Sequence, residues 1–358
     1  MRLIQLLVVC AATLLAGCMT APPPPPSSLT RGDGRIRVLL ARLGAGAKLQ
    51  PDPGLTATAI AGDVGALRYD GPGSLRVGEQ VFPAPVEVWP QGNGWLVIVS
   101  LQLERYLAGV LGGEMPLAWP QAALRAQAIA SRSYAVWRRA VAPIDQPYDV
   151  TATTASQVFV AGKMDDPRAV QAVEGTRDLV LVWDGKVLPA FFHSTCGGHT
   201  APAAAVLSGE APDIPPLAGA VCGFCEPSKY HRWEAVRLPE TKLRTAAEKL
   251  GGRTLGPLTA IVPQAGIDGH ATTLRCTGAQ GEATIPATAF RLAVGPSELR
   301  STAFQAQRVG EDFEFSGRGW GHGAGLCQWG ARGMALAEMD ERAILARYYP
   351  GAVLLPLP

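Results

Sequence analysis

The amino-acid sequence predicts an α+β fold, in which a mixed core carries small β-rich portions at its N-terminal side and between Val236 and Phe315. The 41 Gly and 30 Pro among 358 residues favour many turns and short strands over long helices. One exception, Pro120–Arg139, is long, rich in Ala and apolar at helical spacing. The hydrophobic fraction of 47% suffices for a sizeable core, and the length corresponds to about two domains.

The first 33 residues predict export and attachment to a lipid. Residues 1–17 have the charge and the apolar run of a signal peptide, and this run is too short to span a bilayer comfortably. Residues 15–18 read LAGC, which resembles the lipobox of bacterial lipoproteins, so cleavage before Cys18 and acylation of Cys18 are expected. The alternative is an ordinary signal peptide with an incidental cysteine. Residues 18–33 are rich in Pro and Ser and are expected to form an extended tether.

Two regions of the chain predict β-rich portions. In residues 34–101, short apolar runs separated by Gly, Pro and Asn indicate a small antiparallel unit. Residues 236–315 mix helix and strand signals, with a helix expected at Thr241–Leu250 before Gly251 and Gly252. The strands expected in the first region are Arg35–Leu43, Thr56–Ile60, Ser74–Val77, Val86–Trp89 and Trp95–Leu101.

Residues 102–235 and 316–358 are expected to form the central part of the fold. The long helix Pro120–Arg139 begins at a proline, whose missing N–H costs nothing in a first turn. Next come a shorter helix with an Asp cap and a hairpin that turns at Asp-Gly. The expected elements after the long helix are Asp166–Gly175, the hairpin Asp178–Phe192 and the helical segments Gly325–Met339 and Arg342–Tyr349.

One carboxylate stands out because its neighbours are apolar. Glu114 lies in LGGEMPLAW (residues 111–119), with no Lys or Arg within eight residues on either side, and we expect it in the loop before the long helix. Apolar burial without a cationic partner raises the pKa of a carboxyl group, which suits a proton donor near neutral pH. The alternative is that Glu114 caps the following helix or accepts backbone N–H bonds.

Two further motifs are rich in Gly, His and Cys. Residues 192–200 read FHSTCGGHT, followed by CGFC at residues 222–225. Residues 317–331 read GRGWGHGAGLCQWGA. One Gly-rich loop is weak evidence, because Gly is common in turns. Three motifs in this order and spacing are far more specific.

Together with the Glu114 segment, these motifs resemble the SpoIID/LytB family, which comprises stage II sporulation protein D and the amidase-enhancer proteins of bacteria. The family pattern G-E-M-P…W-P…A-L-x-A-Q-A…R-x-Y-A is matched from Gly113 to Ala135. Phe192–Thr200 and Gly317–Ala331 match the other two family motifs. The resemblance covers roughly residues 35–349, nearly all of the chain after the tether.

The resemblance implies chemistry on peptidoglycan. It implies a lytic transglycosylase that cuts glycan strands stripped of stem peptides and leaves a 1,6-anhydro-N-acetylmuramic acid end. Glu114 matches the essential glutamate of the family. A single carboxyl group can act as acid and then as base here, because the C6 hydroxyl of the sugar is the nucleophile. The alternative is a non-catalytic glycan-binding activator of a cell-wall amidase.

The residues expected to bind the glycan lie in or near the three motifs. Trp320 offers an aromatic face, and glycines let a sugar approach the backbone closely. His322 and Gln328 can form hydrogen bonds with hydroxyl and acetamide groups. The alternative is a tight loop whose glycines serve packing, with His322 a core histidine. The full expected set is Tyr134, Gln157, His193, Ser194, Thr195, Trp320, His322 and Gln328.

The cysteines allow two interpretations. Five remain once Cys10 leaves with the signal peptide and Cys18 takes the lipid, and an odd number cannot all pair within one chain. A disulfide from Cys196 to Cys222 or Cys225 would staple the loop of the second motif. Cys276 and Cys327 could form a second pair. The competing interpretation is a structural zinc ion held by Cys196, Cys222, Cys225 and His199, with His193 as the alternative to His199.

The expected partners are peptidoglycan glycan strands and a cell-wall amidase, with membrane contact only through the lipid anchor. A formal net charge of +2 argues against a nucleic-acid partner. Met19 follows Cys18, where an Asp would favour retention at the inner membrane. The predicted location is therefore the periplasmic face of the outer membrane.

Overall fold

The computed structural model describes residues 34–207, 209, 211–266 and 268–357, and these form an α+β fold, as predicted. The predicted signal peptide (1–17), the lipidated Cys18 and the tether (18–33) lie outside the described residues, so the lipid anchor stays a prediction. Among the helices that are described, none has both the length and the apolar character needed to cross a bilayer.

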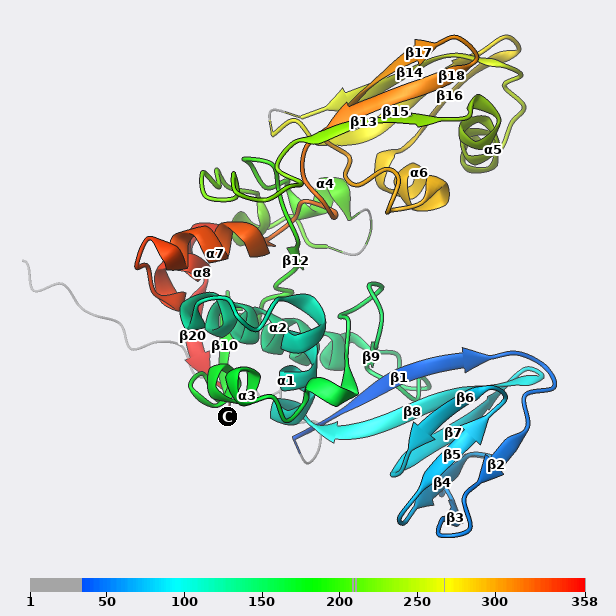
Figure 1. Cartoon of the computed structure of the whole chain (residues 1–358), viewed down its shortest axis with the longest axis vertical. Helices are drawn as coiled ribbons and strands as arrows, with labels where there is room; N and C mark the ends of the chain where they lie inside the picture. Colours follow the sequence, from blue (N-terminus) through cyan, green and yellow to red (C-terminus); the bar gives the residue numbers. More distant parts are fainter. Residues whose placement is uncertain (1–33, 208, 210, 267, 358) are drawn as a thin grey trace, which may run out of the picture.

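The N-terminal part is a β unit with its own hydrophobic core, seen at the lower right of Figure 1. Its strands are β1 Arg35–Leu43, β2 Leu49–Pro51, β3 Thr56–Ala59, β4 Leu67–Asp70, β5 Ser74–Val77, β6 Gln80–Pro83, β7 Val86–Gln91 and β8 Gly94–Gln102. β2, β5 and β6 form a small sheet, and the others form a sheet of order β3-β4-β7-β8-β1-β9. The last strand, β9 (Val150–Thr151), comes from the central part and pairs parallel with β1. β2, β4 and β6, each of three or four residues, were not predicted.

The central part is built around one buried helix. Its elements before the inserted part are α1 Leu103–Glu114, α2 Gln121–Val141, the 3₁₀ turn η2 Ala161–Lys163, α3 Pro167–Glu174, β10 Leu179–Trp183, β11 Lys186–Val187, β12 Phe192–His193, α4 Ala203–Val206 and the 3₁₀ turn η3 Pro215–Leu217. In α2 nearly every residue from 123 to 136 is buried. Its Arg132 is fully buried and forms hydrogen bonds of 2.9 and 2.6 Å with the two carboxylate oxygens of Glu104 in α1. This ion pair joins the two helices.

Two smaller predictions in the central part are confirmed. α3 begins as expected, because the Asp166 side chain accepts a hydrogen bond from the Arg168 N–H and Pro167 occupies the first turn. β10 and β11 form the predicted hairpin around Asp184 and Gly185. The hairpin ends at Val187, earlier than expected, and β12 leaves it to pair elsewhere.

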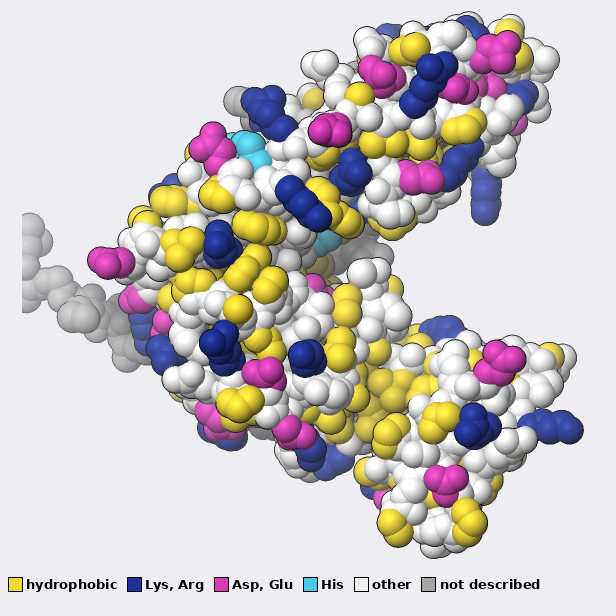
Figure 2. Space-filling model, in the orientation of Figure 1, with side chains coloured by type: hydrophobic (Ala, Val, Ile, Leu, Met, Phe, Trp, Pro, Cys, Tyr) yellow, Lys and Arg dark blue, Asp and Glu magenta, His cyan; other side chains and the backbone are white. Residues whose placement is uncertain are grey.

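The inserted part has a separate hydrophobic core and lies at the top of Figure 1. Its elements are β13 Trp233–Leu238, α5 Glu240–Gly251, β14 Leu258–Ala265, β15 Ala271–Gly278, β16 Gly281–Pro286, α6 Ala287–Val294, β17 Phe304–Val309 and β18 Asp312–Gly317. The strands form two three-stranded sheets, β13-β18-β17 and β14-β15-β16. α6 faces the rest of the molecule, and its Thr288 hydroxyl donates a 2.7 Å hydrogen bond to the carbonyl of Val206 in α4. Figure 2 shows the surface hollowed between the inserted part and the N-terminal part.

After the inserted part the chain returns to the central part as β19 Leu326–Cys327, α7 Gln328–Leu336, α8 Glu341–Tyr348 and β20 Val353–Pro356. β19 pairs parallel with β12, with His193 opposite Cys327. This short pairing brings the second and third sequence motifs side by side. β20 pairs with β10 and completes a three-stranded sheet.

Glu114 was expected in a loop, and this expectation is wrong: Glu114 is the last residue of α1. The sequence hides this helix because Gly109, Gly112 and Gly113 each weaken a helix by about 1 kcal/mol relative to Ala. The structure uses these glycines for packing. A Cβ on Gly109 would lie 2.5 Å from the Phe159 ring, and one on Gly113 would lie 2.4 Å from the carbonyl oxygen of Val158. The chain after β9 therefore lies directly on the glycine face of α1.

We predict that Gly113→Ala lowers the free energy of unfolding by about 1–3 kcal/mol, although Ala is the better helix former. The reason is that its Cβ would meet backbone, which cannot rotate away. Gly162→Ala is the matched control, because no atom lies within 4 Å of a Cβ there. Urea unfolding of both variants checks the prediction. A Gly113→Ala variant as stable as the Gly162→Ala control would contradict it.

Candidate functional site

The Glu114 carboxyl group is held between two parts of the chain that are distant in sequence. Its Oε1 accepts a 2.7 Å hydrogen bond from the backbone N–H of Val158. Its Oε2 accepts a 3.3 Å hydrogen bond from Nε2 of Gln328, the first residue of α7. The carboxyl therefore does accept a backbone N–H bond, as one of the two sequence-based interpretations proposed. Its second contact joins the first and third motifs.

The surroundings of Glu114 favour its neutral, protonated form. Burial raises the pKa of this carboxyl above its ordinary value of 4.5, and the hydrogen bonds from Val158 and Gln328 offset only part of that effect. Within the described residues no Lys or Arg forms an ion pair with Glu114 or contributes to the shift. The apolar segment thus gives Glu114 the property that the sequence predicted for it.

Gln157 and Tyr134 do not occupy the positions expected of glycan-binding residues. Gln157 is completely buried, and its amide accepts a hydrogen bond from the Tyr106 hydroxyl and donates one to the Ser131 carbonyl. A side chain so enclosed cannot contact a saccharide, so that expectation is wrong for Gln157. Tyr134 is 7% exposed, and its ring packs against Trp137 and Phe191.

Two tryptophans that were not predicted as site residues meet where the loop between α1 and α2 contacts α7. Trp119 and Trp329 contact each other edge to face, with ring centroids 5.1 Å apart, and both are half-buried. The Arg332 guanidinium lies over both rings, 5.7 Å from the Trp119 centroid and 5.2 Å from the Trp329 centroid. Trp329 follows Gln328 in α7 and Trp119 lies five residues after Glu114, so both tryptophans come from the segments that carry the contact between Gln328 and Glu114.

The second and third motifs are joined by backbone hydrogen bonds. Thr195 and Trp320 exchange two of them, at 3.1 and 2.7 Å, and the Trp329 N–H donates to the Ser194 carbonyl. Thr195 is buried and contacts the Ser228 hydroxyl at 2.9 Å. Ser194 and Trp320 remain half-buried, and the Trp320 ring meets Tyr230 edge-on at 4.0 Å between centroids.

The two histidines of these motifs are fixed by backbone groups. His193 is 4% exposed, and its Nδ1 donates to the Ala324 carbonyl at 3.0 Å. His322 donates from Nε2 to the Phe192 carbonyl at 2.8 Å and accepts at Nδ1 from the Ala324 N–H at 3.1 Å. Burial, together with the charge of Arg291, lowers the pKa of His322 to about 4. His322 is therefore neutral at neutral pH, and both of its ring nitrogens are already used.

Other segments of the protein occupy the space next to the glycines of the third motif. A Cβ on Gly325 would lie 1.9 Å from the Phe191 carbonyl oxygen, and one on Gly321 would lie 2.8 Å from the His193 side chain. A Cβ on Gly319 would lie 2.7 Å from the Thr195 carbonyl oxygen. At these positions the packing interpretation holds, because the second motif fills the space that a sugar was expected to approach.

Four cysteine thiols converge beneath the joined motifs. The sulfur atoms of this group all lie within 4.8 Å of one another, and every member is buried: Cys196, Cys222, Cys225 and Cys327. The expected histidine ligand is therefore replaced by a cysteine. His199 instead places its Nδ1 2.7 Å from the Thr200 carbonyl oxygen, and His193 is held by Ala324. We call the four residues the cysteine cluster.

The disulfide interpretations do not match this geometry. Cys196 and Cys225 have their sulfur atoms 3.6 Å apart, well beyond the S–S bond length of about 2.05 Å. The suggested pairing of Cys276 with Cys327 is wrong, because Cys276 lies in the core of the inserted part and Cys327 in the central core. Cys327 belongs to the cysteine cluster because β19 carries it to the end of β12.

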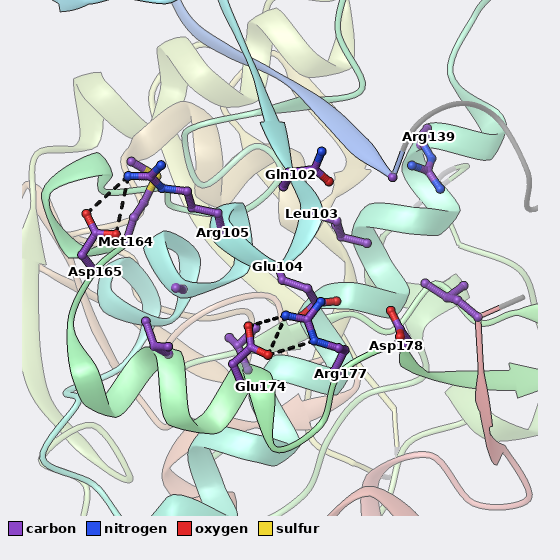
Figure 3. Close-up of a pocket in the computed structure, with 15 residues that line it drawn as sticks. Gln102, Leu103, Glu104, Arg105, Arg139, Met164, Asp165, Glu174, Arg177 and Asp178 are labelled. Atoms are coloured by element: carbon purple, nitrogen blue, oxygen red, sulfur yellow. Dashed lines mark hydrogen bonds and ion pairs between the residues drawn. The ribbon is translucent and has the colours of Figure 1, made fainter.

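A separate pocket of about 540 Å³ opens at the opposite end of α1 from Glu114 (Figure 3). Its lining is charged, and four of these charges form two ion pairs. Arg105 bonds Asp165, and Glu174 forms an ion pair with Arg177. Glu114 and the three motifs do not line this pocket, so it adds nothing to the site.

Comparison with known proteins identifies relatives of this chain. Residues 91–183 match the sequence profile described as Stage II sporulation protein. An uncharacterized protein of Brachyspira hyodysenteriae is 32% identical over 262 residues, which cover 73% of this chain and 69% of that protein. Stage II sporulation protein D of Bacillus amyloliquefaciens is 27% identical, with 75% of this chain and 78% of that protein covered. The amidase enhancer of Bacillus subtilis is 25% identical, with 69% of this chain but only 40% of the enhancer covered.

The fold and the three joined motifs define a protein with a role related to the bacterial cell wall. The chain belongs to the SpoIID/LytB family.

The protonation of Glu114 can be tested through stability. The folded state holds this proton more tightly than the unfolded chain does, so raising the pH from below 4.5 through the raised pKa weakens the natural protein. Glu114→Gln carries no such proton. We therefore expect the variant to gain stability relative to the natural protein across this pH range and then to keep a constant advantage. Urea unfolding at a series of pH values measures the difference, and an advantage that shrinks with rising pH would contradict the assignment.

Proposed function

We propose that this protein cleaves the glycan strand of peptidoglycan as a lytic transglycosylase, with Glu114 as its single acid and base. The observation that carries the proposal is the Glu114 carboxyl group itself. It is half-buried, it has no cationic partner among the described residues, and desolvation raises its pKa. A general acid must hold its proton near the working pH, and desolvation supplies that property.

The proposed reaction needs only one carboxyl group from the protein. Protonated Glu114 gives its proton to the glycosidic oxygen as the bond from that oxygen to C1 breaks. The C6 hydroxyl of the same muramic acid residue attacks C1, and its proton passes to the Glu114 carboxylate. The acid is restored and no water is consumed, so the second carboxylate of hydrolytic glycosidases is not required.

The hydrogen bonds of Glu114 suit both protonation states. Val158 N–H fixes Oε1 as an acceptor, so the mobile proton belongs on Oε2. Gln328 faces Oε2 and can donate to it when it is ionised. When Oε2 is protonated, rotation of the Gln328 side-chain amide lets its oxygen accept a hydrogen bond from Oε2. The adjoining pair of Trp119 and Trp329 offers aromatic surface against which a sugar ring can stack.

We expect Glu114→Gln to lose at least about 1,000-fold in strand cleavage, because the variant has no proton to give. Denuded glycan strands are incubated with the natural protein and the variant, and the products are analysed by mass spectrometry for 1,6-anhydro-N-acetylmuramic acid ends. Glu234→Gln, an exposed position in the inserted part, is the matched control and should cleave normally. Retained cleavage by Glu114→Gln would refute the assignment.

The second candidate function is activation of a cell-wall amidase without catalysis. The similarity to a protein named amidase enhancer favours it. A binding protein, however, gains nothing from a desolvated acid with a raised pKa, so Glu114 favours the enzyme. Absence of cleavage by the natural protein, together with binding to the strands, would move the assignment to the activator.

We also propose that the cysteine cluster holds a structural zinc ion. Four thiolates at about 2.3 Å in a tetrahedron place sulfur atoms about 3.8 Å apart, close to the 3.6 Å between Cys196 and Cys225. All four ligands come from the protein and all are buried, so the ion would have no open position for substrate. Its contribution would be to join the second motif to the start of α7.

Cys327→Ser should reduce the zinc content of the purified full chain from about one ion per molecule to near zero, because the site loses one of four ligands. Cys276→Ser is the matched control: Cys276 is also buried, but it lies in the inserted part. Metal analysis by mass spectrometry of unreduced protein checks both variants. The natural protein free of zinc, or a Cys327→Ser variant that keeps it, would refute the proposal.

A further inference from the structure

One buried arginine near the third motif forms no ion pair with any residue that the structure describes. Arg291 in α6 is 6% exposed, and its Nε is buried without a hydrogen-bond partner. Within the described residues its guanidinium forms no ion pair, and burial alone lowers its pKa to about 10. Arg291 therefore stays charged at neutral pH. An isolated buried charge is costly, and native structures normally pair it.

Arg132 shows how this chain treats a buried arginine with a structural role. Arg132 is fully buried as well, but its guanidinium has a complete set of partners. It bonds both carboxylate oxygens of Glu104 and the carbonyls of Leu179 and Val173. Arg291 has no comparable set. Buried arginines in this protein can therefore be fully paired, and the lack of such partners is particular to Arg291.

Arg291 lies one turn after Thr288 in α6, and the Thr288 hydroxyl bonds the Val206 carbonyl in α4. α4 follows Ala201, which pairs with Ala324 of the third motif, so α6 is docked next to that motif. In agreement with this position, the charge of Arg291 lowers the pKa of His322. His322 cannot serve as its counter-ion, because the ring is neutral and both nitrogens bond the backbone. The 317–331 motif thus carries Gln328 beside Glu114 and His322 beside Arg291. α6 is held against the central part through Thr288 and Val206, which fixes the position of the guanidinium.

We propose that Arg291 is a specificity-determining residue that binds a carboxylate of the glycan strand. A guanidinium recognises a carboxylate with two parallel hydrogen bonds, and such charge-assisted bonds are strong where water is excluded. The assignment rests on the proposed function, since it takes the strand to lie along the motif from Glu114 towards His322. Arg291 does not take part in proton transfer.

Peptidoglycan offers such a carboxylate from two sources. A strand without stem peptides exposes the lactyl carboxylate of muramic acid. A strand with stem peptides has this group in amide linkage and carries its carboxylates on the peptides. The guanidinium can pair with either carboxylate, so the experiment compares substrates that carry only one of the two.

The test measures binding to the full chain carrying Glu114→Gln, so that no strand is cut during the measurement. Four saccharides of equal length are compared by calorimetry: a denuded strand, the same strand with its lactyl carboxylates converted to primary amides, a strand with stem peptides, and a chitooligosaccharide. We expect at least one carboxylate-bearing strand to bind about 10- to 100-fold more tightly than the amidated strand. Whichever of the denuded and peptide-bearing strands binds more tightly identifies the source of the carboxylate that Arg291 recognises.

Arg291→Gln, added to Glu114→Gln, should remove this preference and leave the affinity for the amidated strand within about twofold. Arg275→Gln, an exposed position in the same part of the chain, is the matched control and should keep the preference.

The melting temperature of Arg291→Gln should equal or exceed that of the parent, because an unpaired buried charge is removed. A large decrease would indicate a structural role and overturn the proposal. Equal binding of acid and amide by the parent would overturn it too, while leaving the proposed cleavage intact. Preference without any cleavage by the natural protein would refute the transglycosylase alone, and no binding to any strand would refute both.

Discussion

The arrangement of the site depends on the short parallel pairing of β12 with β19. Phe192 and His193 lie opposite Leu326 and Cys327, although more than 130 residues separate the two strands in sequence. The pairing places the Cys327 thiol in the cysteine cluster and starts α7 at Gln328, whose amide reaches Glu114. Two hydrogen-bonded residues on each strand are too few to hold such a connection by themselves. Two other contacts support the pairing of β12 with β19. They are the backbone hydrogen bonds that Thr195 and Trp320 exchange, and the cysteine cluster.

Glycine residues let the segments that form this connection pack closely together. In the third motif, Gly319, Gly321 and Gly325 let the backbone of the second motif approach within distances that a Cβ would forbid. In α1, Gly109 and Gly113 do the same for the chain that carries Val158. Glu114 therefore receives its two hydrogen bonds from segments that both rest on glycine contacts. The abundance of Gly in the sequence reflects close backbone packing around one carboxyl group as much as turns.

Local sequence determined α2 and α3, and both could be predicted. A run of Ala at helical spacing and an Asp-Pro cap act within a few residues, and nothing distant opposes them. The apolar neighbours of Glu114 were equally visible. α1 could not be recognised, because its glycines weaken the helix and only the packing of Phe159 and Val158 explains them. Cys327 was misassigned for the same reason: its partners are set by the pairing of β12 with β19, which leaves no local pattern.

The site also shows one physical effect acting on two groups with opposite results. Burial disfavours the charged form of Glu114 and of Arg291 alike. For Glu114 the ordinary pKa lies below neutral, so a rise extends the pH range over which the carboxyl group keeps its proton. For Arg291 the ordinary value is so high that a fall to about 10 leaves the charge in place. Desolvation thus favours the protonated form of the carboxyl group bonded by Gln328, whereas the guanidinium that acts on His322 keeps its charge. A neutral sugar ring and an anionic substituent of one strand match these two environments in turn.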